Sequence, residues 1–493
     1  MRERLKEKPN EVVCRNIFEP AMRDDSERSF KNMMRVNIAH VLMLHKQEII
    51  DRHTAKCLVS MLEELQEEGV SVLELNPEYE DLYFNIEKYI ICKGGIEIGG
   101  KMHTGRSRND LNATVTRMNA RDRILEMCEL FLETMKTITQ LAENNIEAVM
   151  SGYTHMQPAQ PITLAHYILS VASALQRDFE RLLSSYKRLN ICPLGGGAFA
   201  GTSFNIDRMY AANLLGFDSV VENSIDAVAS RDYLLEIVAD LAICCSTISR
   251  FAHDLYIWSS DEFKYIEVDS SIAACSSIMP QKKNPITIEH IKAKAAYLIG
   301  SFVGIFGCLK NIPYSHCRDS GSESPREFWI AMDQAKSIFE LLNVTMKNLT
   351  INHENMRKKV NKNFSTVTEL ADELVRKEKL SFRKAHEIVG SIVADCISKG
   401  IEADEISVEM VNKKCEEFGE KNINWSEEEL AKILSAKEAI KRRTSLGGPS
   451  PTQSRETIDK LKDQFERNRR VCEELKSNVI KSNELMVYLM KNI

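Results

Sequence analysis

The sequence predicts an all-α protein dominated by very long helices. Apolar residues recur at helical spacing over stretches longer than 25 residues, and runs with strand-like alternation are few. The chain has 493 residues, 43% of them hydrophobic, so it can bury a large core and is expected to form two or three domains. Helical patterns of this length are typical of coiled coils, membrane spans or helix bundles.

The chain up to about Gly105 has a pattern of short helices and loops. Residues 37–50 and 55–67 carry apolar side chains at near-helical spacing. A glycine-rich irregular segment follows over residues 94–105. We therefore expect a small helical first domain over residues 1–105.

Five long helices are expected next. They cover residues 113–149, 163–189, 232–259, 286–310 and 325–346. Several are apolar on more than one face, which is typical of buried helices. The longest apolar run, Leu298 to Leu309, is interrupted by glycine and serine and is shorter than the ~20 residues that cross a bilayer, so a bundle is favoured. This bundle could pack against other subunits or form the core of a large monomer.

The last part of the chain changes style again. From about residue 361 the helices are shorter and their connections are rich in charge. A Gly-Gly-Pro-Ser-Pro stretch at residues 447–451 precedes a final charged helix. We expect a small third domain over residues 361–493, which leaves 106–360 for the central bundle.

Charge and cysteine content narrow the class of protein. The net charge is −6, from 65 basic and 71 acidic residues, and this balance argues against a nucleic-acid surface. The thirteen cysteines include no Cys-x-x-Cys pair and no zinc-ligand spacing, as expected for reduced thiols in a cytosolic protein. The charged segment over residues 2–8 lacks the apolar core of a signal peptide. A cytoplasmic location is expected.

Three polar segments stand out against the apolar helices. Residues 100–110 place two arginines, a serine and an asparagine at a glycine-flexed turn, which can clamp a carboxylate. In residues 152–161, His155 lies between a hydroxyl and an amide and can act as a general acid or base. Residues 275–285 form a proline-bracketed loop before a helix N-terminus, which suits an anion. The simpler alternatives are a solvated turn, a structural histidine and a surface loop.

The third segment, Cys-Ser-Ser-Ile-Met-Pro-Gln-Lys-Lys-Asn-Pro at residues 275–285, resembles the signature loop of the aspartase/fumarase superfamily. Its Gln-Lys-Lys-Asn-Pro ending, the Gly-Arg-Ser-Arg-Asn-Asp motif at 105–110 and the Thr-His-Met-Gln motif at 154–157 resemble the argininosuccinate lyase branch. The resemblance implies an all-α, three-domain fumarase/aspartase-like fold whose central long-helix bundle forms a tetramer core. It implies a carbon–nitrogen lyase that releases fumarate from an N-succinyl amine, with argininosuccinate as the default substrate.

The resemblance also assigns roles to individual residues. Ser276 would remove the Cβ proton of the succinyl group, and Lys282 would favour its alkoxide. His155, oriented by Glu289, would protonate the departing nitrogen. The remaining candidates would bind the substrate, and these are Ser107, Arg108, Asn109, Thr154, Gln157, Gln160, Asn284, Arg231 and His316. Arg231 could instead hold the subunit core together.

No metal or organic cofactor is implied, and the expected partners are a small N-succinyl amine and other copies of the chain. No nucleic-acid or membrane partner is expected. The motifs lie about 50 to 130 residues apart along the chain. In a bundle of long helices they can meet only where different helices converge, and in this family different subunits, so we expect a shared site and an inactive monomer.

Several residues depart from the argininosuccinate lyase pattern. Cys275 replaces the loop glycine, which can alter how the loop flexes. Tyr83 replaces a histidine of the first domain, and His316, Gly321 and Ser324 replace the tyrosine, glutamine and lysine that hold the arginine half. The amine is therefore open, and an ethylenediamine-disuccinate lyase is a close competitor. A crystallin-like structural relative and a non-catalytic dicarboxylate binder are alternatives from other classes.

Overall fold

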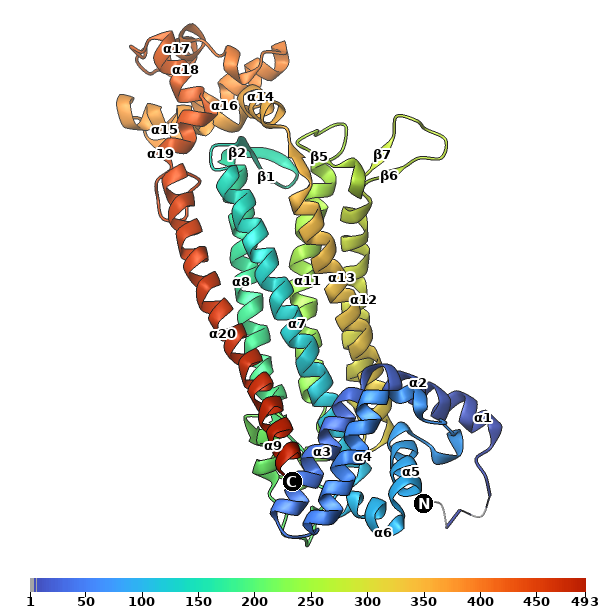
Figure 1. Ribbon diagram of the computed structural model, residues 1–493. Coiled ribbons are helices and arrows are strands. Elements are labelled where there is room, and N and C mark those ends of the chain that lie inside the picture. Colours follow the sequence, from blue (N-terminus) through green and yellow to red (C-terminus); the bar gives the residue numbers. More distant parts are fainter. Residues whose placement is uncertain (1–3, 6) are drawn as a thin grey trace.

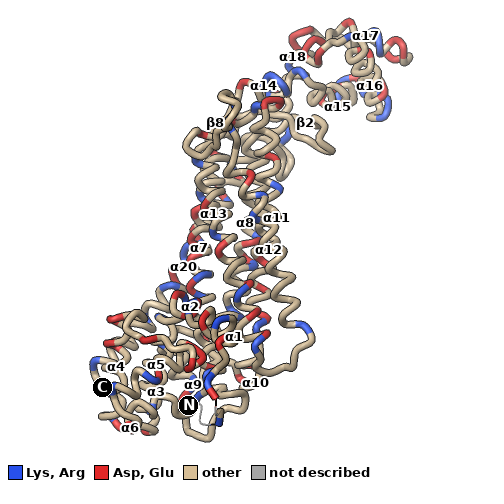
Figure 2. Tube along the Cα trace, turned by 90° about the vertical axis from the view of Figure 1, so that its right-hand side faces the viewer, with Lys and Arg blue, Asp and Glu red and all other residues tan. Residues whose placement is uncertain are grey.

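The computed structural model describes residues 4–5 and 7–493 as a long column of helices with a helical group at each end (Figure 1). Met1, Arg2, Glu3 and Lys6 of the charged N-terminal segment lie outside the described residues. The all-α prediction is confirmed, because strands occur only as four short two-stranded pairs in the described part of the chain. Acidic and basic residues are interspersed over the whole length of the molecule (Figure 2).

The first helical group packs at one end of the column around its own apolar core. Its helices are α1 (Glu11–Val13), α2 (Glu19–Arg28), α3 (Phe30–Lys46), α4 (Arg52–Glu68), α5 (Leu82–Gly94) and α6 (Ile96–Gly99). The carboxylates of Asp51 and Asp81 accept backbone N–H groups at the starts of α4 and α5, where a helix leaves such donors unpaired. The short helices α9 (Arg208–Leu214) and α10 (Ser224–Ala229) lie at the same end.

The column consists of five long helices whose positions agree with the sequence prediction. They are α7 (Arg108–Asn144), α8 (Leu164–Leu189), α11 (Asp232–Trp258), α12 (Ile286–Leu309) and α13 (Ser324–Lys347). The predicted range of α7 was five residues late at both ends, since Ser107 and Asp110 form a reciprocal capping box that begins the helix at Arg108, and the helix ends at Asn144, not at residue 149. This cap fixes the turn that precedes α7.

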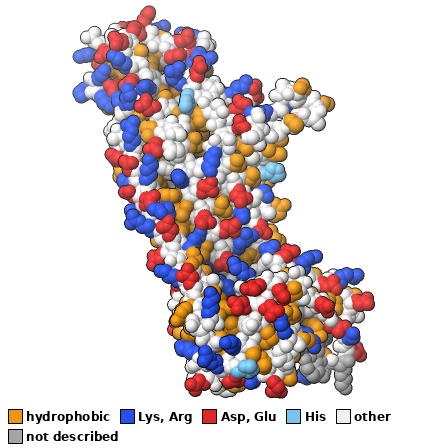
Figure 3. Space-filling model, in the orientation of Figure 1, with side chains coloured by type: hydrophobic (Ala, Val, Ile, Leu, Met, Phe, Trp, Pro, Cys, Tyr) orange, Lys and Arg blue, Asp and Glu red, His pale blue; other side chains and the backbone are white. Residues whose placement is uncertain are grey.

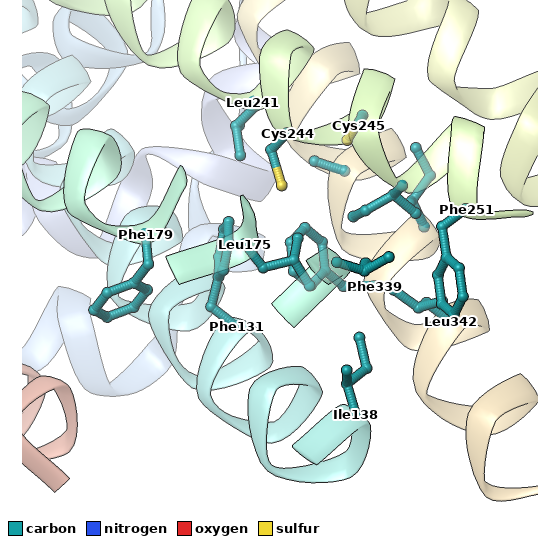
Figure 4. Packing of buried hydrophobic residues seen from close by; sticks show 14 of the residues in the cluster. Phe131, Ile138, Leu175, Phe179, Leu241, Cys244, Cys245, Phe251, Phe339 and Leu342 are labelled. Atoms are coloured by element: carbon teal, nitrogen blue, oxygen red, sulfur yellow. The ribbon is translucent and has the colours of Figure 1, made fainter. Parts of the chain in front are cut away.

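Aromatic side chains fill the middle of the column (Figure 4). The ring of Phe131 from α7 lies 5.6 Å from that of Phe179 and 4.4 Å from that of Phe339, measured between centroids. These phenylalanines come from α7, α8 and α13 and are almost fully buried. Such packing joins the helices into one apolar core that holds the two ends of the column at a fixed separation.

The short strands support loops at the ends of the long helices. β1 (Val149–Thr154) and β2 (Gln157–Thr163) form an antiparallel hairpin after α7. β3 (Ile191–Cys192) pairs with β4 (Ser219–Val220), and β5 (Ile266–Val268) with β8 (Leu349–Ile351). β6 (Ala274–Cys275) pairs with β7 (Lys283–Asn284), so the loop between them projects from the column (Figure 1).

The C-terminal part of the chain first builds the second helical group and then returns along the column. The group contains α14 (His353–Lys362), α15 (Val367–Glu378), α16 (Phe382–Lys399), α17 (Val408–Glu417), α18 (Glu427–Leu434) and α19 (Ala436–Arg442). The 42-residue helix α20 (Pro451–Asn492) then runs beside α7 and α8 back to the first group (Figure 1). The predicted boundaries near residues 105 and 360 remain predictions.

Helix α12 carries an apolar surface that the rest of the chain leaves uncovered. Among the described residues it is the one helix long and apolar enough to cross a membrane by length and composition, and 28% of its apolar window is buried. The run considered in the sequence prediction, Leu298 to Leu309, was only the second half of this 24-residue helix. Tyr297, Ile299 and Val303 are each more than half exposed, and orange side chains mark this edge of the molecule in Figure 3.

Candidate active site

The predicted site residues lie at opposite ends of the column. One end holds Ser107, Arg108 and Asn109 at the start of α7, Arg231 before α11, and His316 after α12. The other end holds Thr154, His155, Gln157 and Gln160 in the hairpin, Ser276, Lys282 and Asn284 in the projecting loop, and Glu289 in the first turn of α12. Helix α7 has 37 residues and therefore separates the two groups by about 55 Å. One chain cannot bring them together.

Residues 103–109, named here the dicarboxylate turn, present Ser107, Arg108 and Asn109 at the N-terminus of α7. The Ser107 hydroxyl accepts the backbone N–H of Asn109 at 3.2 Å, and the Asn109 amide donates to the Ala198 carbonyl at 3.1 Å. Gly105 takes a φ of +73°, a left-handed value that favours glycine. The turn thus directs polar side chains toward the positive end of the α7 dipole.

Arg108 is already held by carboxylates of its own chain. Its Nη1 lies 2.8 Å from Asp81 Oδ2 and 3.2 Å from Glu80 Oε2, and its guanidinium carbon lies 3.8 Å from the centroid of the Phe84 ring. The sequence predicted that Arg108 binds a substrate carboxylate. It did not predict that Glu80 and Asp81 bind the same guanidinium. They fix the guanidinium and offset part of its charge.

Asp110 was not assigned a role from the sequence, although it belongs to the same motif. Its carboxylate is fully buried and accepts the backbone N–H groups of Ser107, Gly195 and Gly197 at 2.8 to 2.9 Å. It therefore ties the dicarboxylate turn to the glycine-rich loop at residues 195–201. The three consecutive glycines at 195–197 could have indicated this contact from the sequence, because the exposed backbone N–H groups of a glycine-rich loop often bind an acid.

Arg231 and His316 lie close to Arg108. Burial, together with the charges of Arg231, Arg318 and Arg108, lowers the pKa of His316 to about 4, so its imidazole is neutral at pH 7. Arg231 is 3% exposed and donates only to the carbonyls of Ser230 and Val228 in the described structure. The motif residues at this end therefore include two guanidinium groups, of which Arg108 is paired with acids and Arg231 is bound to carbonyls.

A cavity of about 190 Å³, named here the amine cavity, opens beside this group. Its wall includes Asp24, Asp25, Asn112, His316, Arg318, Gly321 and Trp329. A Cβ atom at Gly321 would lie 2.9 Å from the His316 ring, so His316 occupies the space of any larger side chain at 321. His316 and Gly321 both depart from the family pattern, and they depend on each other because the ring needs the space above the glycine.

Two other departures do not line the amine cavity. Ser324 is fully buried, and its hydroxyl donates to the Ser320 carbonyl at 3.1 Å. Tyr83 is also fully buried, with its hydroxyl 2.8 Å from His103 Nδ1 and 3.2 Å from Arg106 Nη2. That Tyr83 and Ser324 lie on the amine side stays a prediction, and α5 and the start of α13 turn these side chains into the protein.

His155 lies at the tip of the β1–β2 hairpin. Thr154 pairs with Gln157, so His155 and Met156 form a two-residue turn, and their φ values are +52° and +60°. Such turns normally contain glycine or asparagine, and these two residues therefore carry backbone strain. Thr154, His155, Gln157 and Gln160 are all exposed at this tip. The strained turn holds the imidazole outward, away from its own bundle.

The projecting loop places two backbone N–H groups at the hydroxyl oxygen of Ser276. Its Oγ accepts the backbone N–H of Met279 at 3.0 Å and that of Ile278 at 3.4 Å. Two N–H donors at one oxygen stabilise negative charge there. The Lys282 side chain is exposed in the same loop, and Lys283 is bound to Glu267 at 2.8 Å. Cys275 is accommodated as a strand residue in β6.

Asn284 and Glu289 follow the loop. Asn284 lies in β7 opposite Ala274, and Glu289 is exposed on the first turn of α12. In the part of the chain that the structure describes, no hydrogen bond joins His155 to Glu289 or to Ser276. The expected pairing of His155 with Glu289 therefore does not form within one chain.

Comparison with known proteins gives concordant results. Residues 25–300 match the family described as Lyase, and residues 364–441 match the argininosuccinate lyase C-terminal region. Argininosuccinate lyase 1 of Shouchella clausii (strain KSM-K16) is 42% identical over 482 residues, which cover 98% of this chain and 97% of that protein. The argininosuccinate lyase of Methanocaldococcus jannaschii is 39% identical over 451 residues and 92% of each chain.

A solved structure has the same fold. The crystal structure of EDDS lyase in complex with formate matches with a TM-score of 0.88 and 31% sequence identity. The match covers 98% of this chain and 96% of that chain. The expected fumarase/aspartase-like fold is confirmed by this similarity.

Proposed function

Because the chain belongs to the argininosuccinate lyase family and is an argininosuccinate lyase-like carbon–nitrogen lyase, we propose that it cleaves an N-succinyl amine by anti elimination and releases fumarate. One observation carries the proposal. The hydroxyl of Ser276 accepts two backbone N–H groups inside a loop with the sequence of the superfamily signature. This arrangement suits a base that removes a proton from carbon.

Ser276 acts as the base in this mechanism. A serine hydroxyl is a very weak base, so its alkoxide must be stabilised before it can take the Cβ proton of the succinyl group. The N–H groups of Ile278 and Met279 and the ammonium of Lys282 supply that stabilisation. Once the Cβ proton has moved to Ser276, the electron pair forms the double bond of fumarate and the carbon–nitrogen bond breaks.

The carboxylates of the succinyl group bind to polar side chains from both ends of the column. Ser107, Arg108 and Asn109 come from one end, and Thr154, Lys282 and Asn284 from the other. Gln157 and Gln160 position the substrate. Negative charge that develops on the carboxylate next to the deprotonated carbon is stabilised by Lys282 and Asn284. His155, oriented by Glu289, gives a proton to the departing nitrogen.

The enzyme works as a homotetramer with shared sites. Support comes from the separation of about 55 Å that α7 imposes between the two groups of site residues, because only different chains can close that distance. Further support comes from the uncovered apolar face of α12, which a neighbouring bundle would cover. A cytoplasmic location is supported by the thirteen free cysteines.

A second candidate substrate differs in the amine half. Argininosuccinate remains the default, but His316 and Gly321 reshape the amine cavity together, and the wall carries several carboxylates and three guanidinium groups. A charged wall suits either amine, so the changed shape at His316 and Gly321 is the observation that favours an amine other than arginine, as in ethylenediamine disuccinate. The name of the structural relative, EDDS lyase, points the same way.

Fumarate absorbance tests the function and separates the substrates. Purified protein is mixed first with argininosuccinate and then with ethylenediamine disuccinate, and fumarate formation is followed over time. Fumarate from either compound supports the elimination chemistry, and the higher kcat/KM identifies the better amine. If neither compound reacts and fumarate is not consumed with a panel of amines, the non-catalytic alternatives gain support.

A further inference from the structure

Tyr83 lies beneath the dicarboxylate turn, in a segment that also holds Arg108. We propose that Tyr83 is a positioning residue that holds the dicarboxylate turn in the shape that binds the succinyl carboxylates. The inference rests on the proposed function, in which Ser107, Arg108 and Asn109 contact those carboxylates. Tyr83 itself is fully buried and acts only through the turn.

The tyrosine hydroxyl joins two residues on either side of Gly105. It lies 2.8 Å from His103 Nδ1 and 3.2 Å from Arg106 Nη2, and the guanidinium carbon of Arg106 lies 5.2 Å from the centroid of the tyrosine ring. Gly105 has a positive φ and is the most freely rotating point of the turn. One buried oxygen atom thus fixes the residues before and after the flexible point.

The direction of these hydrogen bonds follows from the chemistry of the groups. A guanidinium only donates, so the tyrosine oxygen accepts from Arg106 and its proton is free to go to His103. Burial, together with the charges of Arg106 and Arg108, lowers the pKa of His103 to about 4, so Nδ1 can accept and the ring proton lies on Nε2. Burial raises the pKa of Tyr83 to about 12, so the hydroxyl keeps its proton.

In the described part of the chain, few other hydrogen-bond partners are available to Arg106 and His103 if the Tyr83 hydroxyl is removed. Arg106 is 8% exposed, its Nη2 also donates to Asn37 Oδ1 at 2.6 Å, and its Nε and Nη1 have no partner among the described residues. Removing the tyrosine oxygen would leave Arg106 with Asn37 alone and His103 Nδ1 without a donor. Unpaired buried groups of this kind favour local rearrangement, here of the turn that presents the substrate ligands.

The residues just before Tyr83 contact Arg108, which follows Ser107 in the chain. Glu80 and Asp81 bind Arg108, and Asp81 also caps α5 by accepting the Phe84 N–H at 2.9 Å. The first turn of α5 therefore contacts the dicarboxylate turn both before and after the serine. A buried tyrosine and two acids on one rigid helix start form a support for three substrate ligands.

The test compares Tyr83→Phe with Tyr186→Phe in steady-state kinetics. Tyr186 is equally buried but lies in α8, away from the turn, so it controls for the loss of a buried hydroxyl. We expect Tyr83→Phe to raise KM by about 10-fold with kcat nearly unchanged, because the turn binds the carboxylates equally in the ground and transition states. Tyr186→Phe should leave both constants near the wild-type values.

A second pair of variants covers the case in which Tyr83→Phe fails to fold. His103→Asn keeps an acceptor at the Nδ1 position and should retain the wild-type KM, whereas His103→Ala should raise KM as Tyr83→Phe does. A wild-type KM in Tyr83→Phe, or equal KM values in the two His103 variants, would overturn the inference while the proposed function stands.

Failure of the proposed function gives a different result. If the wild-type enzyme forms no fumarate from any N-succinyl amine, the elimination chemistry is wrong, and calorimetric binding of fumarate then decides the role of Tyr83. Weaker fumarate binding by Tyr83→Phe than by Tyr186→Phe still supports positioning. Equal binding by the two variants overturns it.

Discussion

At the scale of single residues, Ser276 differs from its neighbour in the backbone groups around its oxygen. The residue is half-buried at the base of the projecting loop, where two N–H groups point at its oxygen. Its neighbour Ser277 is exposed in the same loop. The two serines are alike in chemistry, so the difference between them is the environment of one oxygen atom.

The role of Ser276 is tested by Ser276→Ala, with Ser277→Ala as the matched control. Loss of the base is expected to lower kcat by about 10²- to 10⁴-fold, since that is the usual contribution of a positioned general base. The control should stay close to the wild-type rate, because its hydroxyl is not required for proton removal. The measurement is fumarate absorbance at saturating substrate. Normal turnover by Ser276→Ala would exclude this serine as the base.

Asp25 predicts a pH dependence of stability. Burial and the nearby charges of Asp81 and Asp24 outweigh the hydrogen bond from Ser29, which lowers the pKa, and together raise the pKa of Asp25 to about 6. The folded chain therefore binds the proton more tightly than the unfolded chain, whose aspartates titrate near 4. The free energy of unfolding should accordingly fall as the pH rises from about 4 to about 6 and stay constant above that range.

Asp25→Asn should remove this pH dependence of the free energy of unfolding. At pH 7 the variant is expected to be more stable than the wild type by roughly 1–2 kcal/mol, and at pH 4 the difference should vanish. Urea unfolding at the two pH values measures the effect. Asp24→Asn is the control, because Asp24 is exposed and should change little. A variant less stable than the wild type at pH 7 would show that the Asp25 carboxylate is favourable as a charge.

At the scale of elements, the turn of the β1–β2 hairpin has two consecutive strained residues. Its two turn residues have left-handed φ values without being glycine, and the turn carries His155 at its tip. Strain that is retained in a folded protein must be imposed by the surrounding structure. Here the pairing of Thr154 with Gln157 imposes it.

Substitution of Met156 measures this strain. Met156→Gly accepts a φ of +60° at little cost, whereas Met156→Val places a branched side chain where it is strongly disfavoured. We expect the valine variant to be less stable than the glycine variant by about 1–2 kcal/mol. Thermal unfolding compares them at matched concentration. Equal melting temperatures would mean that the turn relaxes to a different type.

At the scale of the whole molecule, the length of the helices decides where chemistry can occur. The five-helix column keeps the dicarboxylate turn and the Ser276 loop at opposite ends, and the same column exposes an apolar α12 face. Both facts are explained by one arrangement in which neighbouring columns pack side by side and in opposite directions. Assembly and activity should therefore be lost together.

Val303→Glu tests that coupling. Val303 on α12 is 62% exposed in the single chain, and Ile397→Glu on α16 is the control because Ile397 is 64% exposed. A charge on α12 should dissociate the assembly, since a buried unpaired carboxylate is costly, and should abolish fumarate release. The control should do neither. Sedimentation and activity are measured on the same samples, and a fully active monomeric variant would contradict a shared site.

Much of the fold could be predicted from the sequence. The ends of α8, α11, α12 and α13 agree with the predicted ranges to within a residue or two, because apolar periodicity and capping residues are local signals. The β1–β2 hairpin was not predicted, since Pro158 and Pro161 give β2 the composition of a loop. The projecting loop was predicted as a loop, but not the two N–H groups at Ser276.

The sequence by itself determined the helices, the three polar motifs and the family resemblance, since each depends on residues close together in the chain. Only the tertiary structure decided which motifs share an end of the column, that Arg108 is bound by Glu80 and Asp81, and that the buried Tyr83 hydroxyl lies against His103 and Arg106. The physical reason is that contacts between distant residues depend on helix length and on packing angles. Those quantities are set by the whole core, so no local pattern contains them.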